Sequence, residues 1–344
     1  MNLDNTIPEG KGIYVFSDPA GANSVLAIVD KLILLGQLPR KDFLVFTNSI
    51  KTNFDEYKSI LDVSLSNESD FVDVIKSFNP TYIFSGTSLN DFEHLWRKAA
   101  IQENVKVISF IDHWTSYIQR FSFNNEIIFG DQILVINKVA KYEAVLAGIP
   151  EKIINILENP YYEKVKKFKP IIDKKLFFKS NNLNPTKLIV LYISDYLSTN
   201  YAKNVDGLCE LGYDEYTVFS DLMDCLNSYD NNFISKFQFV IKIHPKAPID
   251  KFNFILKKYN VKNLDIITLR DCDSLTVNYY SDYVIGMHSN MVIESFLLGK
   301  RLLRVQTGQL FKDLIKLSPL SNNVITNKKN LKNTFFKFLN NNLS

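Results

Sequence analysis

FVIKIHPKAP (residues 239–248) is the stretch from which the predicted architecture of this chain is built. Its apolar run is interrupted only by Lys242 and stops at His244-Pro245, a pattern typical of a buried strand that ends in a loop. Because Pro245 cannot continue a strand ladder, we expect the imidazole of His244 at the carboxyl end of the strand. Open α/β sheets bind their ligands at that end.

A second strand-and-loop unit follows in YVIGMHSNMVIESFLLGKRLLRV (residues 283–305). It predicts a strand, a turn at His288, a helix and a further strand. We expect Ser289 or Asn290 at the N-cap of that helix, where backbone N–H groups and the helix dipole favour an anion. Two strands of one sheet, one ending in His244 and the other in a serine-capped helix, predict a phosphate-binding pocket.

The composition is that of a globular protein with two domains. The chain has 344 residues, 46% hydrophobic and 22% charged, which suggests two domains of ordinary size. The net charge of +3 and the absence of an arginine-rich stripe argue against a nucleic-acid partner. The three cysteines show no CxxC spacing and are expected to be free thiols in a reducing cytoplasm. We expect neither a secretory leader nor a membrane span, because no run approaches the roughly eighteen apolar residues required.

Strands and helices alternate in the N-terminal half. Strands are predicted at residues 12–16, 42–47, 82–85, 106–111, 132–136 and 153–157. SDPAGAN (residues 17–23) is expected to be a loop whose small residues permit close backbone approach. It is neither a GxGxxG fingerprint nor a P-loop, so neither a dinucleotide nor an ATP site is predicted.

FIDHW (residues 110–114) contains the strongest catalytic candidates of this half. It delivers an acid, an imidazole and an indole together where a strand ends. Asp112 or His113 is a candidate general base, or Asp112 orients His113. Trp114 is a candidate platform for a sugar ring. The alternative interpretation is that His113 closes a loop and Trp114 fills the core.

The segments predict four regions. Residues 1–160 form an acceptor-side Rossmann-like domain, 161–186 a lysine-rich linker, 187–325 a nucleotide-sugar-binding Rossmann-like domain, and 326–344 a C-terminal helix. One DxD spacing occurs at Asp271-Cys272-Asp273, and we interpret it as ordinary capping of a following helix. With no HExxH and no Cys/His cluster, we predict no metal and no cofactor.

The paired motifs IKIHPKAP and GMHSNMVIESFLLGK resemble the His-Pro and serine motifs of GT-B-fold transferases. Bacterial sialyltransferases, Kdo transferases of capsule synthesis and CDP-glycerol glycerophosphotransferases carry such a pair. LYISDYLS (residues 191–198) is similar to the opening of that family's donor domain, and SDPAGAN and FIDHW look like N-terminal motifs of related surface-polysaccharide transferases. The resemblance implies an α/β GT-B architecture, in which two Rossmann-like domains with parallel sheets face a cleft. The chain departs from the sialyltransferases in lacking an Asp/Glu-Asp/Glu-Gly triplet in its N-terminal half, the motif where they place their base.

The resemblance also implies site residues. His244 is expected to contact the donor's phosphate or ribose, and Ser289 and Asn290 its phosphate, where fixed donors stabilise the charge that develops on the leaving group. The whole candidate donor-binding set is Lys242, His244, Pro245, His288, Ser289, Asn290, Glu294, Ser194 and Ser198. The catalytic candidates are Asp112, His113 and Asp18, with Asp112 favoured, and the acceptor-binding candidates are Gly21, Asn23, Trp114 and Ser85.

The predicted reaction moves a nonulosonic-acid or Kdo-like sugar from a CMP donor to a surface glycan. The alternatives are a transferase with a UDP-sugar or CDP-glycerol donor, a UDP-sugar 2-epimerase of the same architecture, and a non-catalytic sugar-nucleotide-binding protein. The few arginines of the C-terminal half count mildly against the epimerase. The expected partners are a nucleotide sugar and a glycan or lipid-linked glycan. The expected location is the cytoplasm, and lysine-rich residues 164–179 leave peripheral membrane contact open.

Overall fold

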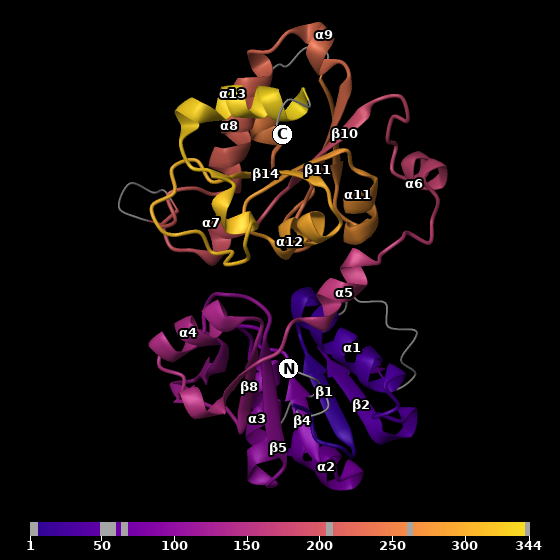
Figure 1. The fold of residues 1–344 in the computed structure, drawn as a ribbon, viewed down its shortest axis with the longest axis vertical. Coiled ribbons are helices and arrows are strands. Elements are labelled where there is room, and N and C mark those ends of the chain that lie inside the picture. Colours follow the sequence, from indigo (N-terminus) through magenta and orange to yellow (C-terminus); the bar gives the residue numbers. More distant parts are fainter. Residues whose placement is uncertain (1–5, 49–59, 63–67, 204–208, 260–263, 341–344) are drawn as a thin grey trace. The chain divides into compact units, whose positions relative to one another are not determined.

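A computed structural model of the chain describes residues 6–48, 60–62, 68–203, 209–259 and 264–340. The chain forms two compact units, Met1–Lys164 and Val165–Ser344, which we call unit 1 and unit 2. Both are layered α/β structures (Figure 1). Among the described residues, none of the helices combines the length and apolar composition that crossing a membrane requires.

Unit 1 is built on a parallel sheet whose described strands lie in the order β3-β2-β1-β4-β5-β8-β9. Its elements are β1 (Gly12–Phe16), α1 (Pro19–Leu34), β2 (Phe43–Thr47), β3 (Ile60–Asp62), α2 (Glu68–Phe78), β4 (Tyr82–Ser85), α3 (Phe92–Gln102), β5 (Lys106–Ile111), β6 (Ser122–Phe123), β7 (Glu126–Ile127), β8 (Gln132–Val135), α4 (Lys138–Leu146), β9 (Ile154–Ile156) and α5 (Pro160–Lys166). The strands are short, continuous apolar runs because helices cover both faces of such a sheet. The strand order reverses between β1 and β4, which is where an open sheet of this kind takes a ligand.

Aromatic side chains fix α2 and α3 to one face of the unit 1 sheet. The ring of Trp96 in α3 lies 4.7 Å from that of Phe46 in β2 and 5.0 Å from that of Phe71 in α2. All three side chains are almost fully buried. Truncating a buried aromatic of this size costs about 3–5 kcal/mol, so Trp96 is a principal anchor of the layer.

The predicted loop at residues 17–23 is wrong in its extent, because α1 already begins at Pro19. Asp18 has an extended backbone and accepts a hydrogen bond from the Gly21 amide at 2.6 Å, so it is the N-cap. Proline is favoured at the first helical position, since its fixed φ suits the helix and no N–H is lost. The small residues therefore form the first turn of a helix that approaches the sheet edge closely.

Unit 2 has a parallel sheet whose described strands lie in the order β12-β11-β10-β13-β14-β15. Its elements are α6 (Lys174–Ser180), β10 (Leu188–Ile193), α7 (Leu197–Asn200), α8 (Glu215–Asn227), α9 (Asn231–Ile234), β11 (Phe237–Lys242), α10 (Asn253–Lys258), β12 (Asp265–Leu269), α11 (Ser274–Tyr280), β13 (Tyr283–Gly286), α12 (Asn290–Leu297), β14 (Arg301–Val305), β15 (Val324–Ile325) and α13 (Lys328–Leu339). This is the Rossmann strand order, with its reversal between β10 and β13.

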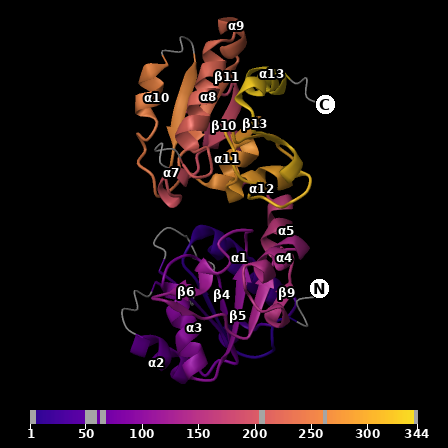
Figure 2. The same cartoon turned by 90° about the vertical axis from the view of Figure 1, so that its left-hand side faces the viewer.

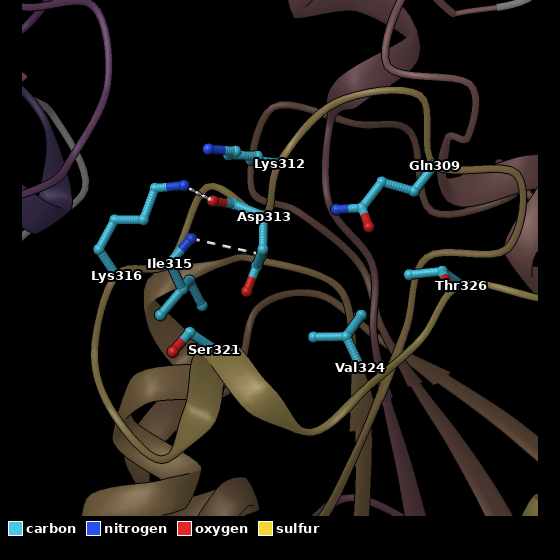
Figure 3. Close-up of a pocket in the computed structure, with 8 residues that line it drawn as sticks. All are labelled: Gln309, Lys312, Asp313, Ile315, Lys316, Ser321, Val324 and Thr326. Atoms are coloured by element: carbon cyan, nitrogen blue, oxygen red, sulfur yellow. Dashed lines mark hydrogen bonds between the residues drawn. The ribbon is translucent and has the colours of Figure 1, made fainter.

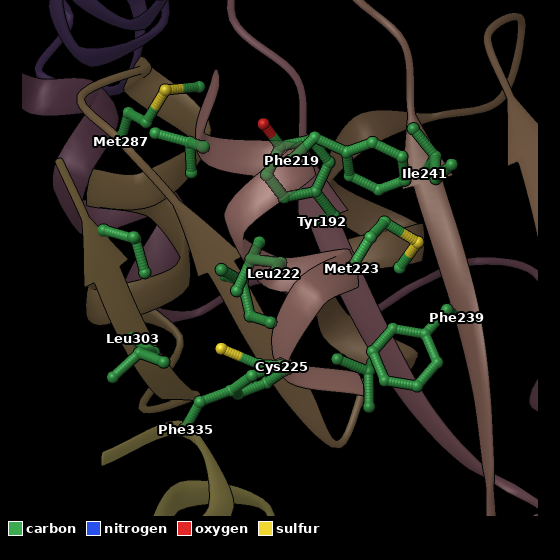
Figure 4. Close-up of a cluster of buried hydrophobic side chains, with 14 of the residues drawn as sticks. Tyr192, Phe219, Leu222, Met223, Cys225, Phe239, Ile241, Met287, Leu303 and Phe335 are labelled. Atoms are coloured by element: carbon green, nitrogen blue, oxygen red, sulfur yellow. The ribbon is translucent and has the colours of Figure 1, made fainter. Parts of the chain in front are cut away.

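The largest described apolar cluster of unit 2 lies between its sheet and the pair α8 and α13 (Figure 4). Phe219 and Met223 of α8 face the strands, and Phe335 closes the cluster from α13. Alternate residues of β10, Val190 and Tyr192, point into it, as the two-residue repeat of a strand requires. The C-terminal helix is therefore an integral part of the core.

The segment 161–186 contains α6 and most of α5, and its residues from Val165 onward belong to unit 2. The Tyr280 hydroxyl donates a hydrogen bond to the Ile172 carbonyl at 2.7 Å. The Tyr280 ring also contacts those of Phe177 and Phe178 at 5.6 and 6.3 Å.

Helices α8 and α10 lie near each other in unit 2, as Figure 2 shows from a second side. Helix α10 begins only at Asn253, because the Pro248 and Asp250 carbonyls close turns before it.

Candidate functional site

The carboxyl edge of the unit 2 sheet gathers the loops after β10, β11 and β13, which carry most of the predicted donor-binding residues. Glycine brings the last of these loops close to its strand. A Cβ atom on Gly286 would lie 2.5 Å from Cγ2 of Val292, so only glycine lets α12 pack this tightly on β13. The N-terminus of α12 is thereby held at the reversal of the strand order.

Ser289 is the N-cap of α12, which settles the predicted choice between it and Asn290. Its hydroxyl oxygen accepts a hydrogen bond from the Met291 amide at 3.2 Å, and Asn290 is the first helical residue. Glu294 is buried in the middle of the same helix. The free backbone amides and positive dipole end of this eight-residue helix favour an anion.

His288 is buried directly before this cap and is held from two sides. Its amide donates to the Asp195 carboxylate at 3.2 Å, and its Nδ1 lies 3.2 Å from the Tyr213 hydroxyl. Burial lowers the pKa of the His288 imidazole and raises that of the Asp195 carboxyl. The His288 imidazole is therefore neutral and held by Tyr213, while the His288 backbone amide joins the β10 and β13 loops.

His244 lies half-buried after β11 and stacks on Tyr196 of the neighbouring loop. The two rings are 5.2 Å apart and inclined by only 9°. Burial, reinforced by Lys246 and Lys251, lowers the pKa of His244 to about 4, so the ring is neutral at pH 7. Nδ1 accepts the Lys246 amide at 3.2 Å, which places the ring proton on Nε2 as a hydrogen-bond donor.

A buried ion pair between Glu215 and Lys251 holds the β10 loop in place. Glu215 is fully buried and accepts hydrogen bonds from the Leu197 amide at 2.9 Å and the Ser198 amide at 3.0 Å. The Ser198 hydroxyl donates to its other oxygen at 2.6 Å. Lys251 donates to Glu215 at 2.5 Å and to the Asp195 carbonyl at 3.2 Å. Ser198 therefore holds the loop through Glu215, and Ser194 bonds the same backbone, its hydroxyl donating to the Asp195 carbonyl at 3.1 Å.

Lys242 is turned away from these loops. Its ammonium donates to the Arg270 carbonyl at 2.5 Å, beyond the end of β12, and burial lowers its pKa. Asp273 caps α11 by accepting the Thr276 amide at 2.7 Å, and Asp271 pairs with the Arg270 guanidinium. In the described ranges no three His, Cys, Asp or Glu side chains are grouped as metal ligands.

The carboxyl edge of unit 1 carries acids whose pKa values are raised. Burial raises the pKa of Asp112 to about 6, against the lowering effect of Arg120, whose Nη1 lies 3.6 Å from the carboxylate. Electrostatic repulsion from Asp18 adds to the rise in the pKa of Asp112, so these two predicted catalytic acids lie close enough to interact. Arg120 is itself held by the Thr87 carbonyl at 2.6 Å.

Glu93 was missed by the sequence analysis and is the most enclosed acid of this edge. It is fully buried in α3 and accepts hydrogen bonds from the amide and hydroxyl of Ser17, at 3.1 and 2.8 Å. The Ser88 amide donates at 3.1 Å and the Ser88 hydroxyl donates as well. Burial raises the pKa of Glu93 to about 7, and electrostatic repulsion from Asp18 is the second cause. Glu93 thus joins the loops after β1 and β4, and nothing in a helical sequence pattern marks it.

The other N-terminal candidates are divided between the edge and the interior. The indole N–H of Trp114 donates to Asn137 at 3.2 Å and the side chain is buried, so little of its ring is exposed for stacking. His113 is half-buried, with Nδ1 3.3 Å from the Thr115 hydroxyl. Ser85 is buried and shares a 2.9 Å hydrogen bond with Ser109 inside the sheet. Gly21 and Asn23 lie in the first two turns of α1.

No protein-family model matches this chain, and no curated protein matches it by sequence. Solved structures resemble it along nearly its whole length. The S. aureus MnaA–UDP structure is 14% identical, covers 96% of this chain and 88% of its own, and has a TM-score of 0.65. The UDP-GlcNAc 2-epimerase from Neisseria meningitidis, bound to UDP-GlcNAc, is 13% identical over 95% of this chain and 91% of its own, with a TM-score of 0.63. Anabaena Alr3699/HepE in complex with UDP-glucose is 11% identical over 96% and 90%, with a TM-score of 0.60.

These similarities establish the fold. The chain has a GT-B-like α/β fold made of two Rossmann-like units with parallel sheets, as predicted. The neighbours include enzymes of UDP-sugar epimerisation, while no family match supports the narrower resemblance to sialyltransferases and Kdo transferases.

Proposed function

We propose that the chain is an enzyme that acts on a UDP-linked sugar and binds the nucleotide diphosphate on unit 2. The observation that carries this proposal is the pairing of the His244 Nε2 donor with the serine-capped N-terminus of α12. The β10 loop connects the two, since Tyr196 stacks on His244 and Asp195 accepts the His288 amide. Similar solved structures bound to UDP, UDP-GlcNAc and UDP-glucose support a UDP ligand.

The electrostatics of these groups suit a leaving diphosphate. His244 is neutral at pH 7 and donates without carrying charge. The amides at the start of α12 are fixed by the helix, so they need no reorganisation when negative charge develops on a phosphate oxygen. Ser289 and Asn290 are the phosphate ligands in this proposal, and Glu294 lies one turn further along the helix.

The reaction we place first is inversion of one sugar carbon, the activity stated in the name of the Neisseria neighbour. When the proton leaves the carbon next to the anomeric carbon, its electron pair forms a C1–C2 double bond and the C1–O bond to the diphosphate breaks. Return of a proton to the opposite face and re-addition of the diphosphate complete the inversion, so the reaction needs one group that accepts a proton and one that donates it. We assign one transfer to Asp112, whose pKa is raised to about 6. We assign the other to Asp18, which interacts electrostatically with Asp112.

Sugar transfer to an acceptor is the second candidate. The observation that favours it is Asp112 itself, because a single carboxylate with a raised pKa suffices to accept the proton of an attacking hydroxyl. His113 follows it directly in the same loop. In this case the predicted CMP donor stays an alternative to UDP.

Calorimetry of the full chain with UDP, CMP and GDP tests the nucleotide. We expect UDP to bind at least roughly tenfold more tightly than the others, a difference of about 1.4 kcal/mol. Tighter binding of CMP would favour the sialyltransferase-like donor and exclude the epimerase.

Incubation with UDP-GlcNAc in deuterated water tests the reaction. Epimerisation is expected to introduce deuterium at sugar C2 and to produce a second epimer without any acceptor, both visible by proton NMR. Release of UDP only when a glycan acceptor is added, with no exchange at C2, would establish transfer instead.

A further inference from the structure

A separate pocket of about 350 Å³ lies in unit 2 beyond the ends of β14 and β15 (Figure 3). Small-molecule sites range from about 300 to 1,000 Å³, so this one is large enough for a monosaccharide and small for a nucleotide sugar. Its walls come from the segment after β14, the turn before β15 and the residue after β15. It uses none of the residues that we assign to the nucleotide.

A buried arginine builds the walls of the pocket. Arg304 is 1% exposed and donates two hydrogen bonds to the Asp313 carboxylate, at 2.5 and 2.6 Å. The same guanidinium donates to the Leu320 carbonyl at 3.0 Å and to the Met287 carbonyl at 3.0 Å. One cation therefore fixes the Asp313 side, the turn that presents Ser321, and the residue before His288.

A second set of hydrogen bonds fixes the opposite wall. Gln309 donates to Gln306 at 2.6 Å, and the fully buried Gln306 donates to Asp313 at 3.0 Å. Ile315 and Val324 are the apolar residues of the lining, and Ile315 has no exposed surface. The pocket is thus a preorganised structure, in which a ligand need not order the walls when it binds.

The charge balance of the pocket is positive. Burial alone would raise the pKa of Asp313, but hydrogen bonds from Arg304 outweigh it and hold the pKa below its usual value. The carboxylate is therefore ionised and neutralised by a buried guanidinium, so no acid of the lining is left to pair with the exposed ammonium of Lys312.

The groups that face the cavity are donors suited to a charged polyol. Figure 3 shows Lys312 and Gln309 on one side and Ser321 and Val324 on the other. Within the part of the chain that the structure describes, the Lys312 ammonium and the Ser321 and Thr326 hydroxyls have no hydrogen-bond partner. Hydroxyls pair with the hydroxyls of a sugar, and an ammonium pairs with a carboxylate or phosphate.

We propose that this pocket is a second ligand site, specific for a monosaccharide that carries a carboxylate or phosphate. Lys312 binds the anionic group, Ser321 and Thr326 bind ring hydroxyls, and the half-buried Val324 contacts the apolar face of the ring. The Arg304 link to the Met287 carbonyl connects this site to the loop that carries His288 and Ser289.

Ligand-observed saturation-transfer NMR on the full chain tests the site, with glucuronate, glucose 6-phosphate, glucose and inorganic phosphate as probes. UDP is added in excess so that nucleotide binding cannot account for the signal. We expect at least one of the two acidic sugars to bind, and both neutral glucose and inorganic phosphate to bind roughly tenfold more weakly or not at all. The two acidic probes distinguish a carboxylate from a phosphate as the preferred group. Equal binding of glucose and both acidic sugars, or binding by none of the probes, would overturn the proposal.

Variants locate the binding. Lys312→Glu is expected to weaken the acidic probe roughly tenfold or more, and Thr326→Val to weaken it less. Lys236→Glu is the matched control, because it makes the same charge change on an exposed lysine before β11, at the opposite edge of the sheet. Binding that survives Lys312→Glu places the probe elsewhere.

Ser289→Ala separates this proposal from the proposed function. It should weaken UDP and leave the acidic probe unchanged. If the wild-type chain binds the acidic probe but does not bind UDP, the proposed function is contradicted and the second site is not.

Discussion

At the carboxyl edge of unit 2 the deepest acid, Glu215, is neutralised by Lys251 at 2.5 Å, and its pKa is lowered although burial alone would raise it. At the same edge of unit 1 the deepest acid, Glu93, is held by serine donors and its pKa rises to about 7. The pKa of Asp112 at the same edge rises to about 6, chiefly through burial. Both edges end parallel sheets with a reversal of strand order, yet the pKa of Glu215 is lowered and that of Glu93 is raised. Burial raises the pKa of Asp195 at the unit 2 edge as well, so the contrast is between the two deepest acids.

The difference indicates separate tasks for the two edges. An acid that is permanently ionised and paired can hold loops and present donors, but it cannot exchange a proton near pH 7. An acid whose pKa lies near 6 or 7 can do so. Glu215 is therefore suited to holding a loop, and Glu93 and Asp112 to exchanging a proton.

We expect the largest effect from a substitution that removes the proton-exchanging group of unit 1. Asp112→Asn should lower turnover by roughly 10²–10⁴-fold, the range for a general acid or base, and leave UDP affinity unchanged. Steady-state kinetics and calorimetry on the same preparation measure both. Asp131→Asn is the control, because Asp131 bonds the Val107 amide before β8, at the opposite edge. Near-normal turnover in Asp112→Asn with loss in Asp18→Asn would assign the proton transfer to Asp18.

Breaking the pair beneath the unit 2 loop should give the next largest effect. Lys251→Met leaves Glu215 charged, fully buried and without its cation, which costs about 3–5 kcal/mol of unfolding free energy. Denaturant titration measures this loss. The double variant Lys251→Met with Glu215→Gln should recover much of it, since no buried charge is left unpaired. A single variant as stable as wild type would show that the pair is dispensable and the contrast between the edges is weak.

The pH dependence of stability sharpens the contrast. The pKa of Glu93 is about 7 in the folded chain and 4.5 ordinarily, so between these pH values the folded state binds more protons than the unfolded state. Stability should then be greatest below pH 4.5, as far as Glu93 is concerned, and fall by about 3 kcal/mol as the pH rises through 7.

Urea titrations at several pH values measure this fall. Glu93→Gln should flatten it only partly, because the raised pKa of Asp112 acts in the same direction. A Glu93→Gln chain with the same pH slope as wild type would show that Glu93 is ionised in the fold.

The smallest expected effect concerns a single hydrogen bond to the nucleotide. Ser289→Ala should weaken UDP binding by about 1–3 kcal/mol, as expected for one donor to a charged group. Asp230→Ala removes a helix cap of the same kind from α9, which precedes β11 at the opposite edge, and should change stability without changing UDP affinity. Equal UDP affinity in both variants would make Ser289 an ordinary cap.

Local patterns in the sequence predicted most of the strands and the cap of α12. The apolar run before His244 and the serine before a helix predicted where the loops begin, and α12 with its Ser289 cap follows that prediction. These features depend on residues within one turn of each other. Their local character also explains the error at residues 17–23, where small residues were interpreted as a loop although Asp18 and Pro19 are a helix start.

By itself the sequence determined the alternation of strands and helices, the two parallel sheets and the loops that carry His244, Ser289 and Asp112, because hydrophobic periodicity and caps act locally. Only the tertiary structure decided that Glu215 meets Lys251 and that Glu93 meets Ser17. These partners lie 36 and 76 positions apart, and packing of helices on the sheets selects them. The protonation of a buried acid follows from such neighbours and from lost solvent, which no local pattern contains.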